Sequence, residues 1–397
     1  MGVAAAAAGL AAWRYWPEQG FWNPCYARLP RRLADHELVR AAWDGLDPAK
    51  VWDSHAHLIG TGDGGSGIYV NPQTESLLSP GQYARRLFFL NAGCAHDATG
   101  SVDHAYVDRI RNLIDGMRKG TKVVLYAFER AHHESGEPDL DHTIFYVPNE
   151  YARDVAKKYA EDFEWVASIH PYRKDALEAL EQAKQGGARG VKWLPSAMGI
   201  DPASSRCELF FRKMKDFDLP LIAHAGLERA VLGREAHDFG NPLRLRRALE
   251  AGVRVVVAHC ASMGEDRDLD KGPNGPYVES FALFARVFEK YSNAYGDISA
   301  MTQVNRAGPA LVRTIESSAW HARLLNGSDY PLPGVMPVFS VDYLVSLKLL
   351  PESAAQLLRD IRAHNPLLFD FVLKRTLRSN GKAFAAGVFE TRGFFVR

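Results

Sequence analysis

Residues 253–259 read VRVVVAH, and residues 219–224 read LPLIAH. Both are short apolar runs that end in a histidine, and 35 residues separate His224 from His259. Such nearly continuous apolar runs are typical of strands buried on both faces of a parallel sheet. The residues between them, NPLRLRRALEAG (241–252), have the apolar spacing of a helix, with an Asn–Pro start and a glycine end. This stretch therefore predicts a strand–helix–strand unit.

The same alternation extends over most of the chain. We predict strands at Val51–His57, Lys122–Phe128, Trp165–His170, Gly190–Leu194, Pro220–His224, Val253–His259, Ala294–Ser299 and Arg323–Ser328. These eight alternating units predict a (β/α)8 TIM barrel, an α/β fold in which the carboxyl ends of all strands meet at one rim. The interval between the first two strands is too long for one helical connection, so we expect elaborated βα loops, above all the first.

Length and composition agree with one barrel preceded by an N-terminal extension. The chain has 397 residues, of which 47% are hydrophobic and 24% charged, a globular composition within the size range of α/β barrels. It carries 48 basic and 47 acidic side chains and a net charge of +1, which gives no bulk attraction to nucleic acid. We divide the chain into an extension, residues 1–49, and a barrel, residues 50–397.

The first residues leave two interpretations open. Residues 2–13 form an apolar, alanine-rich run that is shorter than the roughly 20 residues needed to span a bilayer and lacks the preceding basic residue of a signal peptide. It is either the remnant of a membrane anchor, with weak membrane association through residues 2–22, or a helix packed on the barrel. The four cysteines are too few for a disulfide scaffold and leave the compartment open. A homo-oligomer is compatible with the sequence.

The first predicted strand carries the motif DSHAH at residues 53–57. Successive side chains of a strand point to opposite faces, so His55 and His57 project from the same face and can bind one ion with their imidazoles. Three more residues able to bind a metal, His224, His259 and Asp329, stand at the carboxyl ends of later predicted strands. Because these ends converge on the catalytic rim of a barrel, we expect all five side chains to meet there.

These motifs carry a resemblance to a known family. The stretches concerned are DSHAHL (53–58), PLIAHAG (220–226), VVVAHC (255–260) and LLNGSDYP (324–331). They resemble the amidohydrolase superfamily, in particular its amidohydrolase-2 branch of TIM-barrel metal-dependent hydrolases, over roughly residues 50–370. The resemblance implies one divalent metal ion, for which we expect zinc, held by His55, His57 and His224. It also implies Asp329 as a further ligand and general base, and His259 as a catalytic group that orients or polarises the substrate carbonyl.

Three more residues are candidates for the site. Lys192 lies on the fourth predicted strand, where some members of the superfamily carry a carbamylated lysine that bridges two metals; otherwise its ammonium would pair with a substrate carboxylate or a nearby acid. We expect a single ion, and a second only if Lys192 is carbamylated. His170, at the end of the third strand, and Arg306, in the loop after the seventh, are candidates for substrate binding.

The sequence thus predicts an enzyme that acts on a small molecule. A metal ion held by imidazoles and a carboxylate activates water near neutral pH, which favours hydrolysis of an amide, ester or lactone bond with Asp329 as the base. Non-oxidative decarboxylation of an aromatic or unsaturated carboxylic acid, which the same branch performs on the same ligands, is the alternative. A barrel that serves only as a membrane-tethered binding protein is the rival outside enzymes.

Overall fold

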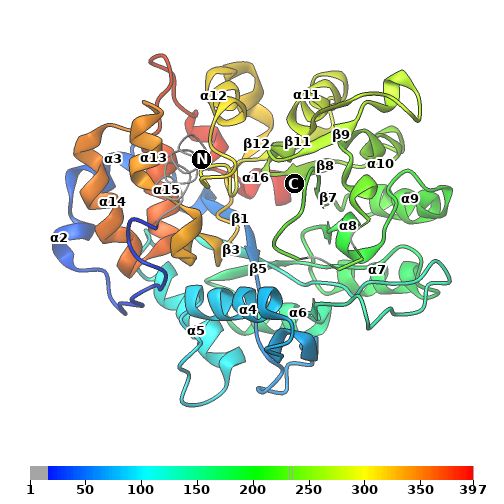
Figure 1. Cartoon of the computed structure of the whole chain (residues 1–397). Coiled ribbons are helices and arrows are strands. Elements are labelled where there is room, and N and C mark those ends of the chain that lie inside the picture. The colour runs from blue at the N-terminus through cyan, green and yellow to red at the C-terminus, as the bar shows by residue number, and fades with distance from the viewer. Residues whose placement is uncertain (1–16, 232, 235, 397) are drawn as a thin grey trace, which may run out of the picture.

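The computed structural model describes residues 17–231, 233–234 and 236–396 (Figure 1). Its centre holds eight parallel strands: β1 (Trp52–His57), β3 (Lys122–Tyr126), β5 (Phe163–Val166), β6 (Val191–Trp193), β7 (Leu221–His224), β8 (Val255–Ala258), β11 (Ala294–Asp297) and β12 (Leu324–Leu325). Seven of them lie within their predicted segments, and β5 overlaps its segment but begins earlier, at Phe163. The strand prediction is therefore confirmed.

The strands close into a barrel in chain order. They form two ladders, β1-β3-β5 and β6-β7-β8-β11-β12, which are joined by bridges between Ala167 and Val191 and between Ala56 and Tyr330. At the second junction the amide of Asp329 donates to the carbonyl of His55 at 2.7 Å. The chain therefore has the predicted TIM-barrel fold, and the closure itself brings Asp329 beside the first strand.

Helices surround the barrel (Figure 1). Those between successive strands are α4 (Pro80–Ala92), α5 (Val102–Ile114), α6 (Asn149–Lys158), α7 (Ala176–Gln185), α8 (Pro195–Met198), α9 (Glu208–Asp216), α10 (Arg246–Glu250), α11 (Ser280–Lys290) and α12 (Pro309–Glu316). The ends of the chain add α2 (Arg31–Ala34), α3 (Glu37–Ala42), α13 (Val341–Ser346), α14 (Glu352–His364), α15 (Pro366–Thr376) and α16 (Arg392–Phe395). Short antiparallel pairs in the loops are β2 (Tyr69–Val70) with β4 (Phe145–Tyr146) and β9 (Glu265–Arg267) with β10 (Tyr277–Glu279).

The first βα loop is elaborated, as predicted. Residues 58–121 contain β2, α4 and α5, and α4 crosses in front of the barrel (Figure 1). The glycine-rich start of this loop wraps around the buried carboxylate of Asp103, which accepts hydrogen bonds from the amides of Thr61, Gly62 and Gly64. The loop therefore leads away from the rim along a defined path and places α4 beside the strand ends.

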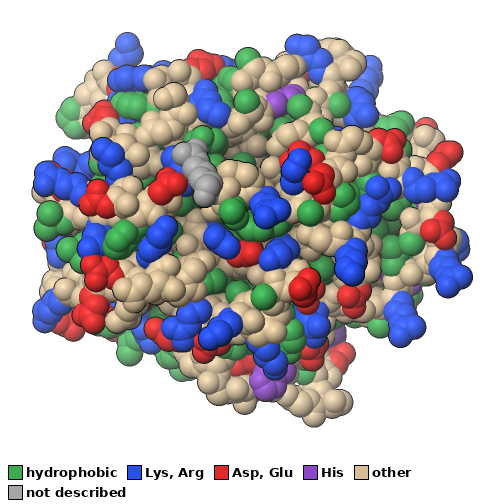
Figure 2. All heavy atoms as spheres, turned by 180° about the vertical axis from the view of Figure 1, so that it is seen from behind, with side chains coloured by type: hydrophobic (Ala, Val, Ile, Leu, Met, Phe, Trp, Pro, Cys, Tyr) green, Lys and Arg blue, Asp and Glu red, His purple; other side chains and the backbone are tan. Residues whose placement is uncertain are grey.

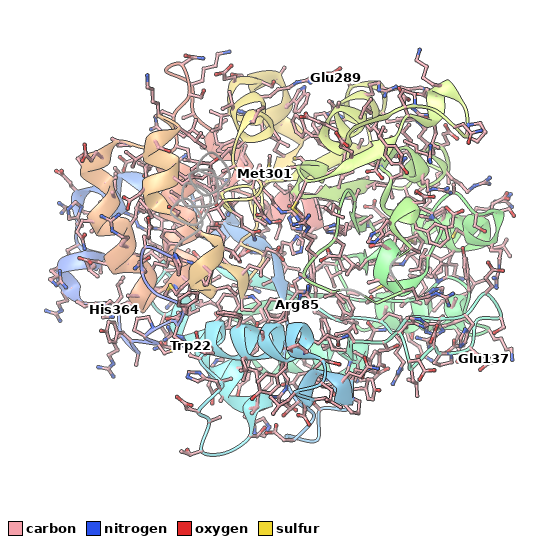
Figure 3. All side chains as sticks on the ribbon, viewed as in Figure 1. Trp22, Arg85, Glu137, Glu289, Met301 and His364 are labelled. Atoms are coloured by element: carbon pink, nitrogen blue, oxygen red, sulfur yellow. A yellow bond between two sulfur atoms is a disulfide. The ribbon has the colours of Figure 1, made fainter. Side chains whose placement is uncertain are left out.

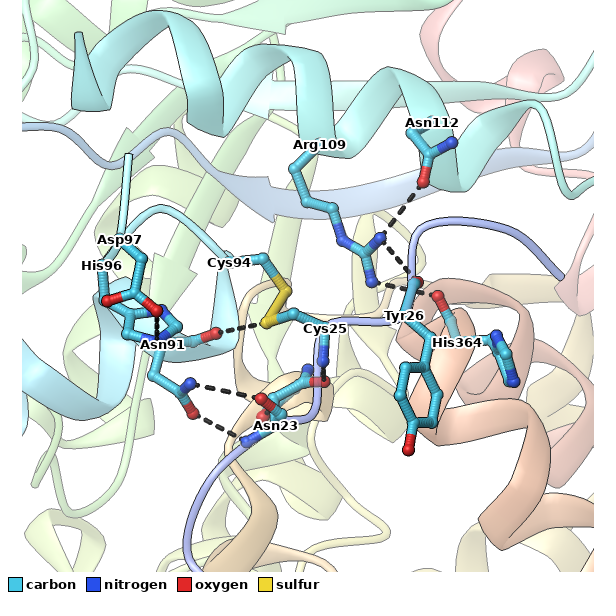
Figure 4. Close-up of a disulfide and its surroundings, with 11 residues drawn as sticks. Asn23, Cys25, Tyr26, Asn91, Cys94, His96, Asp97, Arg109, Asn112 and His364 are labelled. Atoms are coloured by element: carbon cyan, nitrogen blue, oxygen red, sulfur yellow. Dashed lines mark hydrogen bonds and ion pairs between the residues drawn. A yellow bond between two sulfur atoms is a disulfide. The ribbon is translucent and has the colours of Figure 1, made fainter. Parts of the chain in front are cut away.

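The described part of the extension packs on the C-terminal helices. Trp43 lies 4.4 Å from Phe371 between ring centroids, and a disulfide, which the sequence analysis did not anticipate, joins Cys25 to Cys94 just after α4 (Figure 4). Arg109 of α5 donates to the carbonyl of Tyr26 at 3.0 Å. These contacts join the extension to the barrel core, and the domain division at residue 50 stays a prediction.

Most of the predicted membrane segment lies outside the described residues. Of residues 2–22 the structure describes only 17–22, among which Phe21 and Trp22 are 46% and 50% exposed. In the described ranges, every helix is too short or too polar to cross a bilayer. On the face opposite to the one seen in Figure 1, acidic and basic side chains are interspersed (Figure 2), in keeping with the small net charge.

Candidate metal centre

Three ligand atoms meet at the rim of the barrel. The Nε2 atom of His55 lies 3.3 Å from Nε2 of His57 and 3.4 Å from Oδ1 of Asp329. The third side of the triangle, from His57 Nε2 to Asp329 Oδ1, measures 3.3 Å. Ligands of a tetrahedral zinc ion at about 2.0–2.1 Å are roughly 3.3–3.4 Å apart. The three atoms therefore fit one face of a tetrahedral metal site, as this donor set requires.

Hydrogen bonds fix the imidazoles in a form that binds metal. Nδ1 of His55 contacts Oδ2 of Asp297 at 2.9 Å, and Nδ1 of His259 contacts the carbonyl oxygen of Ser299 at 3.1 Å. Nδ1 of His224 lies 3.3 Å from a carboxylate oxygen of Glu228. Carboxylate and carbonyl oxygens only accept, so Nδ1 of His55 and Nδ1 of His259 must donate, and the Nε2 atoms of these two rings keep a lone pair.

One nitrogen of His224 has no hydrogen-bond partner among the described residues. Its Nε2 atom is buried without a hydrogen-bond partner, and its ring contacts that of His259 at 5.4 Å between centroids. Burial lowers the pKa of His224 to about 4, so the imidazole is neutral at physiological pH and able to bind a metal. The His224 Nε2 atom lies outside the group of ligand atoms within 4.8 Å that includes His55, His57 and Asp329.

Asp329 and His259 form the far side of the site. Oδ2 of Asp329 lies 3.6 Å from Nε2 of His259. Burial alone would raise the pKa of Asp329, but the imidazoles of His55 and His259 and a hydrogen bond from His57 hold it well below its usual value. Burial lowers the pKa of His259. At neutral pH Asp329 is therefore a carboxylate and His259 a neutral imidazole. Either group can accept a proton.

Backbone geometry explains why these side chains reach the rim. Asp329 has a φ of 60°, and His259, Cys260 and Ala261 have consecutive φ values of 54°, 51° and 49°. Left-handed conformations of non-glycine residues cost free energy and gather at functional sites. Gly327 approaches His55 so closely that a Cβ there would lie 2.5 Å from the Cβ of His55. The NGSD sequence thus folds tightly against β1.

The remaining predicted residues divide into two groups. Lys192 is buried on β6, with Nζ 3.3 Å from Nε2 of His55, and burial lowers its pKa. The Arg306 guanidinium contacts Oγ of Ser262 at 3.4 Å. Burial is the main cause that lowers the pKa of His224 and of His259, and the nearby charge of Arg306 lowers both further. His170 lies elsewhere.

The ring of His170 packs against His132 at 4.6 Å between centroids, and its Nε2 atom lies 3.2 Å from the carbonyl of Met198. The structure therefore brings Lys192 and Arg306 to the rim but holds His170 in a separate cluster beside it. His170 is not among the residues that line the cavity, and its role in substrate binding stays a prediction.

A cavity of about 130 Å³ opens above the ligand atoms. His57, Lys192, His224, His259 and Asp329 line one end of it. The walls are mostly apolar and include Phe89, Phe128, Phe145, Leu194 and Leu332. The arrangement can hold a small molecule with its reactive group at the metal end.

Sequence reasoning missed four residues of this site: Asp297, Ser299, Glu228 and Arg85. Asp297 is the last residue of β11 and Ser299 follows it by two positions. Both lie at the carboxyl end of the predicted strand Ala294–Ser299, and that position at the rim was a usable signal. Glu228 lies four residues after His224, and only the conformation of the intervening loop brings its carboxylate to the imidazole. Arg85 lines the cavity from α4, whose path could not be derived from the sequence.

Comparisons with solved structures gave distant matches. A solved TIM-barrel protein from Bordetella bronchiseptica is 16% identical, with 78% of this chain and 98% of that chain covered at a TM-score of 0.48. A 5-carboxyvanillate decarboxylase from Sphingomonas paucimobilis is 12% identical, with 79% and 95% covered at a TM-score of 0.44. A probable 2-pyrone-4,6-dicarboxylic acid hydrolase from Acinetobacter baumannii is 15% identical, with 80% and 97% covered at a TM-score of 0.41.

A search of curated proteins gave no significant match. The model of the amidohydrolase-2 family, described as amidohydrolase, matches residues 52–368. This range contains every barrel strand and all five metal-competent rim residues predicted from the sequence. The chain therefore belongs to the amidohydrolase-2 family of enzymes.

Proposed function

We propose that this enzyme hydrolyses an amide, ester or lactone bond in a small molecule at a single divalent metal ion, with Asp329 as the general base. The observation that supports it is the triangle of His55 Nε2, His57 Nε2 and Asp329 Oδ1, with sides of 3.3–3.4 Å, two residues of which, His57 and Asp329, line the cavity. His224, with its unpartnered Nε2 atom, would complete the ligand set.

The nature of the donors suggests zinc. Three imidazole nitrogens and one carboxylate oxygen are ligands that zinc accepts. When bound, such an ion would lower the pKa of a water molecule and polarise the bond to be broken. One ion is proposed because Nζ of Lys192 lies directly against Nε2 of His55, a contact that a free amine can make; a carbamate on Lys192 would add a second ion.

The residues of this chain would manage the proton. Asp329 directs Oδ1 toward the ligand triangle and Oδ2 toward Nε2 of His259, 3.6 Å away. A proton lost by the attacking water can therefore pass to Oδ2 of Asp329 and be held there or on His259 until the leaving group takes it. Ser299 accepts from Nδ1 of His259 and so keeps Nε2 available for that proton.

Decarboxylation of a small carboxylic acid is the second candidate. It is favoured by two basic side chains that could attract a carboxylate: Lys192, which lines the cavity, and Arg306, which is buried near Glu228 and Asp329. In that reaction the proton held by Asp329 or His259 would replace the lost carboxylate on carbon. The two candidates use the same residues, so their products must distinguish them.

The test begins with metal analysis of the purified protein, for which we expect about one ion per chain. Chelation should abolish turnover of a panel of aryl esters, anilides and lactones, and added Zn²⁺ should restore it. Release of CO2 from aromatic acids, without hydrolysis of any ester, anilide or lactone, would refute the hydrolase and support the decarboxylase. Metal-free protein of unchanged stability and no turnover would refute both.

A further inference from the structure

The helix α4 presents one face to the cavity, and that face changes character along its length. Gln82, Arg85, Arg86, Phe89 and Leu90 all line the cavity. Their spacing of three, four, seven and eight residues places them on one side of the helix. Figure 3 shows Arg85 on the side of α4 that faces the barrel. The first half of this face is polar and cationic, and the second half is apolar.

Contacts with the rest of the loop orient this face relative to the metal end. The apolar half lies against the segment that follows Asp329: Leu332 lines the same cavity, and a Cβ on Gly334 would lie 2.6 Å from the carbonyl oxygen of Ala92. The cationic half lies against residues 72–75, where Arg86 pairs with Glu75 at 2.9 Å. The arginines are therefore at the far end of the cavity from the metal ligands.

The polar groups of the far end are unsatisfied. Among the described residues Arg85 has no hydrogen-bond or ion-pair partner, although it is half-buried. Oε1 of Gln82 and Nε of Arg86 are buried and also lack partners. A guanidinium partly removed from water gains most from a carboxylate or phosphate, which it binds through two hydrogen bonds. The adjoining Phe89, Phe128 and Phe145 suit an apolar body instead.

We propose that the substrate is an amphipathic acid: a molecule with the reactive bond at one end, an apolar or aromatic body, and an anionic group bound by Arg85. Four and five residues of helix separate Arg85 from Phe89 and Leu90, which corresponds to roughly 6–7.5 Å along the axis of α4. Turnover of this substrate class rests on the proposed metal-dependent reaction, whereas its binding does not depend on that reaction.

Equilibrium binding to the metal-stripped protein tests the substrate class without turnover. The probes are 4-phenylbutanoate and its neutral isostere 4-phenylbutanamide, measured by calorimetry. We expect the acid to bind at least tenfold more tightly than the amide, and Arg85→Gln to remove this preference while leaving amide binding unchanged. Arg85→Lys should keep part of it, and Arg32→Gln, an exposed arginine on α2, should keep all of it. Equal binding of both probes, or a preference that survives Arg85→Gln, would overturn the proposal.

Kinetics separates this proposal from the proposed function. With metal restored, nitrophenyl esters with and without a terminal carboxylate should differ in kcat/KM, and Arg85→Gln should reduce that difference mainly through KM. Hydrolysis of both esters at equal kcat/KM would refute the amphipathic acid and leave the hydrolase standing. Tight, Arg85-dependent binding of the acid with no metal-dependent hydrolysis would refute the hydrolase and leave the substrate class standing.

Discussion

Two buried clusters of histidines and acids lie at the carboxyl ends of the barrel strands, and only one of them is suited to a metal ion. The metal cluster consists of His55, His57, His224, His259 and Asp329. The second, which we call the arginine-closed cluster, consists of Glu129, His132, His170 and Arg173. Glu129, His132 and His170 are at most 3% exposed. Residue type and position at a strand end therefore do not distinguish the clusters.

The difference is clearest at one histidine of each cluster, His170 and His224. In the arginine-closed cluster, Arg173 donates to Glu129 at 2.6 Å, and Nδ1 of His170 accepts from the amide of Tyr172 while Nε2 donates to the carbonyl of Met198. In the metal cluster, Nδ1 of His55 and Nδ1 of His259 donate to oxygens, and Nε2 of His224 is buried without a partner. A bound cation would supply, in the metal cluster, the charge that an arginine supplies in the other.

The largest expected effect is in the metal cluster. His55→Ala removes one corner of the ligand triangle, so metal content should fall from about one ion per chain to near zero. Ester hydrolysis should fall by at least about a thousandfold, because the activation of water is lost with the ion. Elemental analysis and kcat/KM on an aryl ester measure the two effects. His170→Gln, the matched change in the arginine-closed cluster, should keep its metal; equal loss in both variants would erase the distinction.

A smaller effect should follow from the residue that orients His55. Asp297→Asn keeps the shape of the side chain but loses the charge that fixes Nδ1–H of His55. Partners of this kind typically contribute 10–100-fold to metal affinity. We expect a loss of that size in competition with a chromogenic chelator, with full activity recovered at saturating Zn²⁺. Unchanged affinity would mean that Asp297 does not position the ligand.

The fold and the five rim positions of the metal cluster could be predicted from the sequence because both follow from strand periodicity. Apolar runs that end in histidine or aspartate identify strand ends, and the barrel brings those ends together. The spacing of His55 and His57 likewise follows from the alternation of side chains in a strand. None of these inferences requires the conformation of a loop.

What the sequence could not supply depends on loops and on pairing. His170 ends a predicted strand, as His224 does, and only the carbonyl of Met198 and the amide of Tyr172 show that its nitrogens are already used. Arg85 is one of many arginines in the chain, and only the packing of α4 places it in the cavity. The Cys25–Cys94 disulfide joins residues 69 positions apart, which no spacing rule indicates.

In the arginine-closed cluster, charge removal should affect stability rather than metal binding. Burial would raise the pKa of Glu129, but His132 and Arg173 hold it at about 2. Because this pKa lies below the ordinary value of 4.5, the stabilisation is present above pH 4.5 and is lost as the pH falls toward 2. Glu129→Gln should lower the free energy of unfolding by about 1–3 kcal/mol at pH 7, with unchanged metal content. A gap between variant and wild type that stays constant down to pH 3 would contradict this assignment.

The smallest effect concerns the pH dependence that His170 contributes. Burial, with the neighbouring His132, lowers the pKa of His170 to about 3 from 6.5, so the neutral ring stabilises the fold above pH 6.5 and that stability is lost as the pH falls toward 3. Wild-type protein should therefore lose up to about 1.4 kcal/mol per pH unit more than His170→Gln between pH 6 and 4. Urea unfolding of both proteins in chelator removes the metal contribution from the comparison. The control is His104→Gln, at an exposed histidine on α5, which should retain the wild-type dependence of the unfolding free energy on pH. Parallel pH curves for His170→Gln and wild type would contradict the prediction, because they would mean that burial does not lower the pKa of His170.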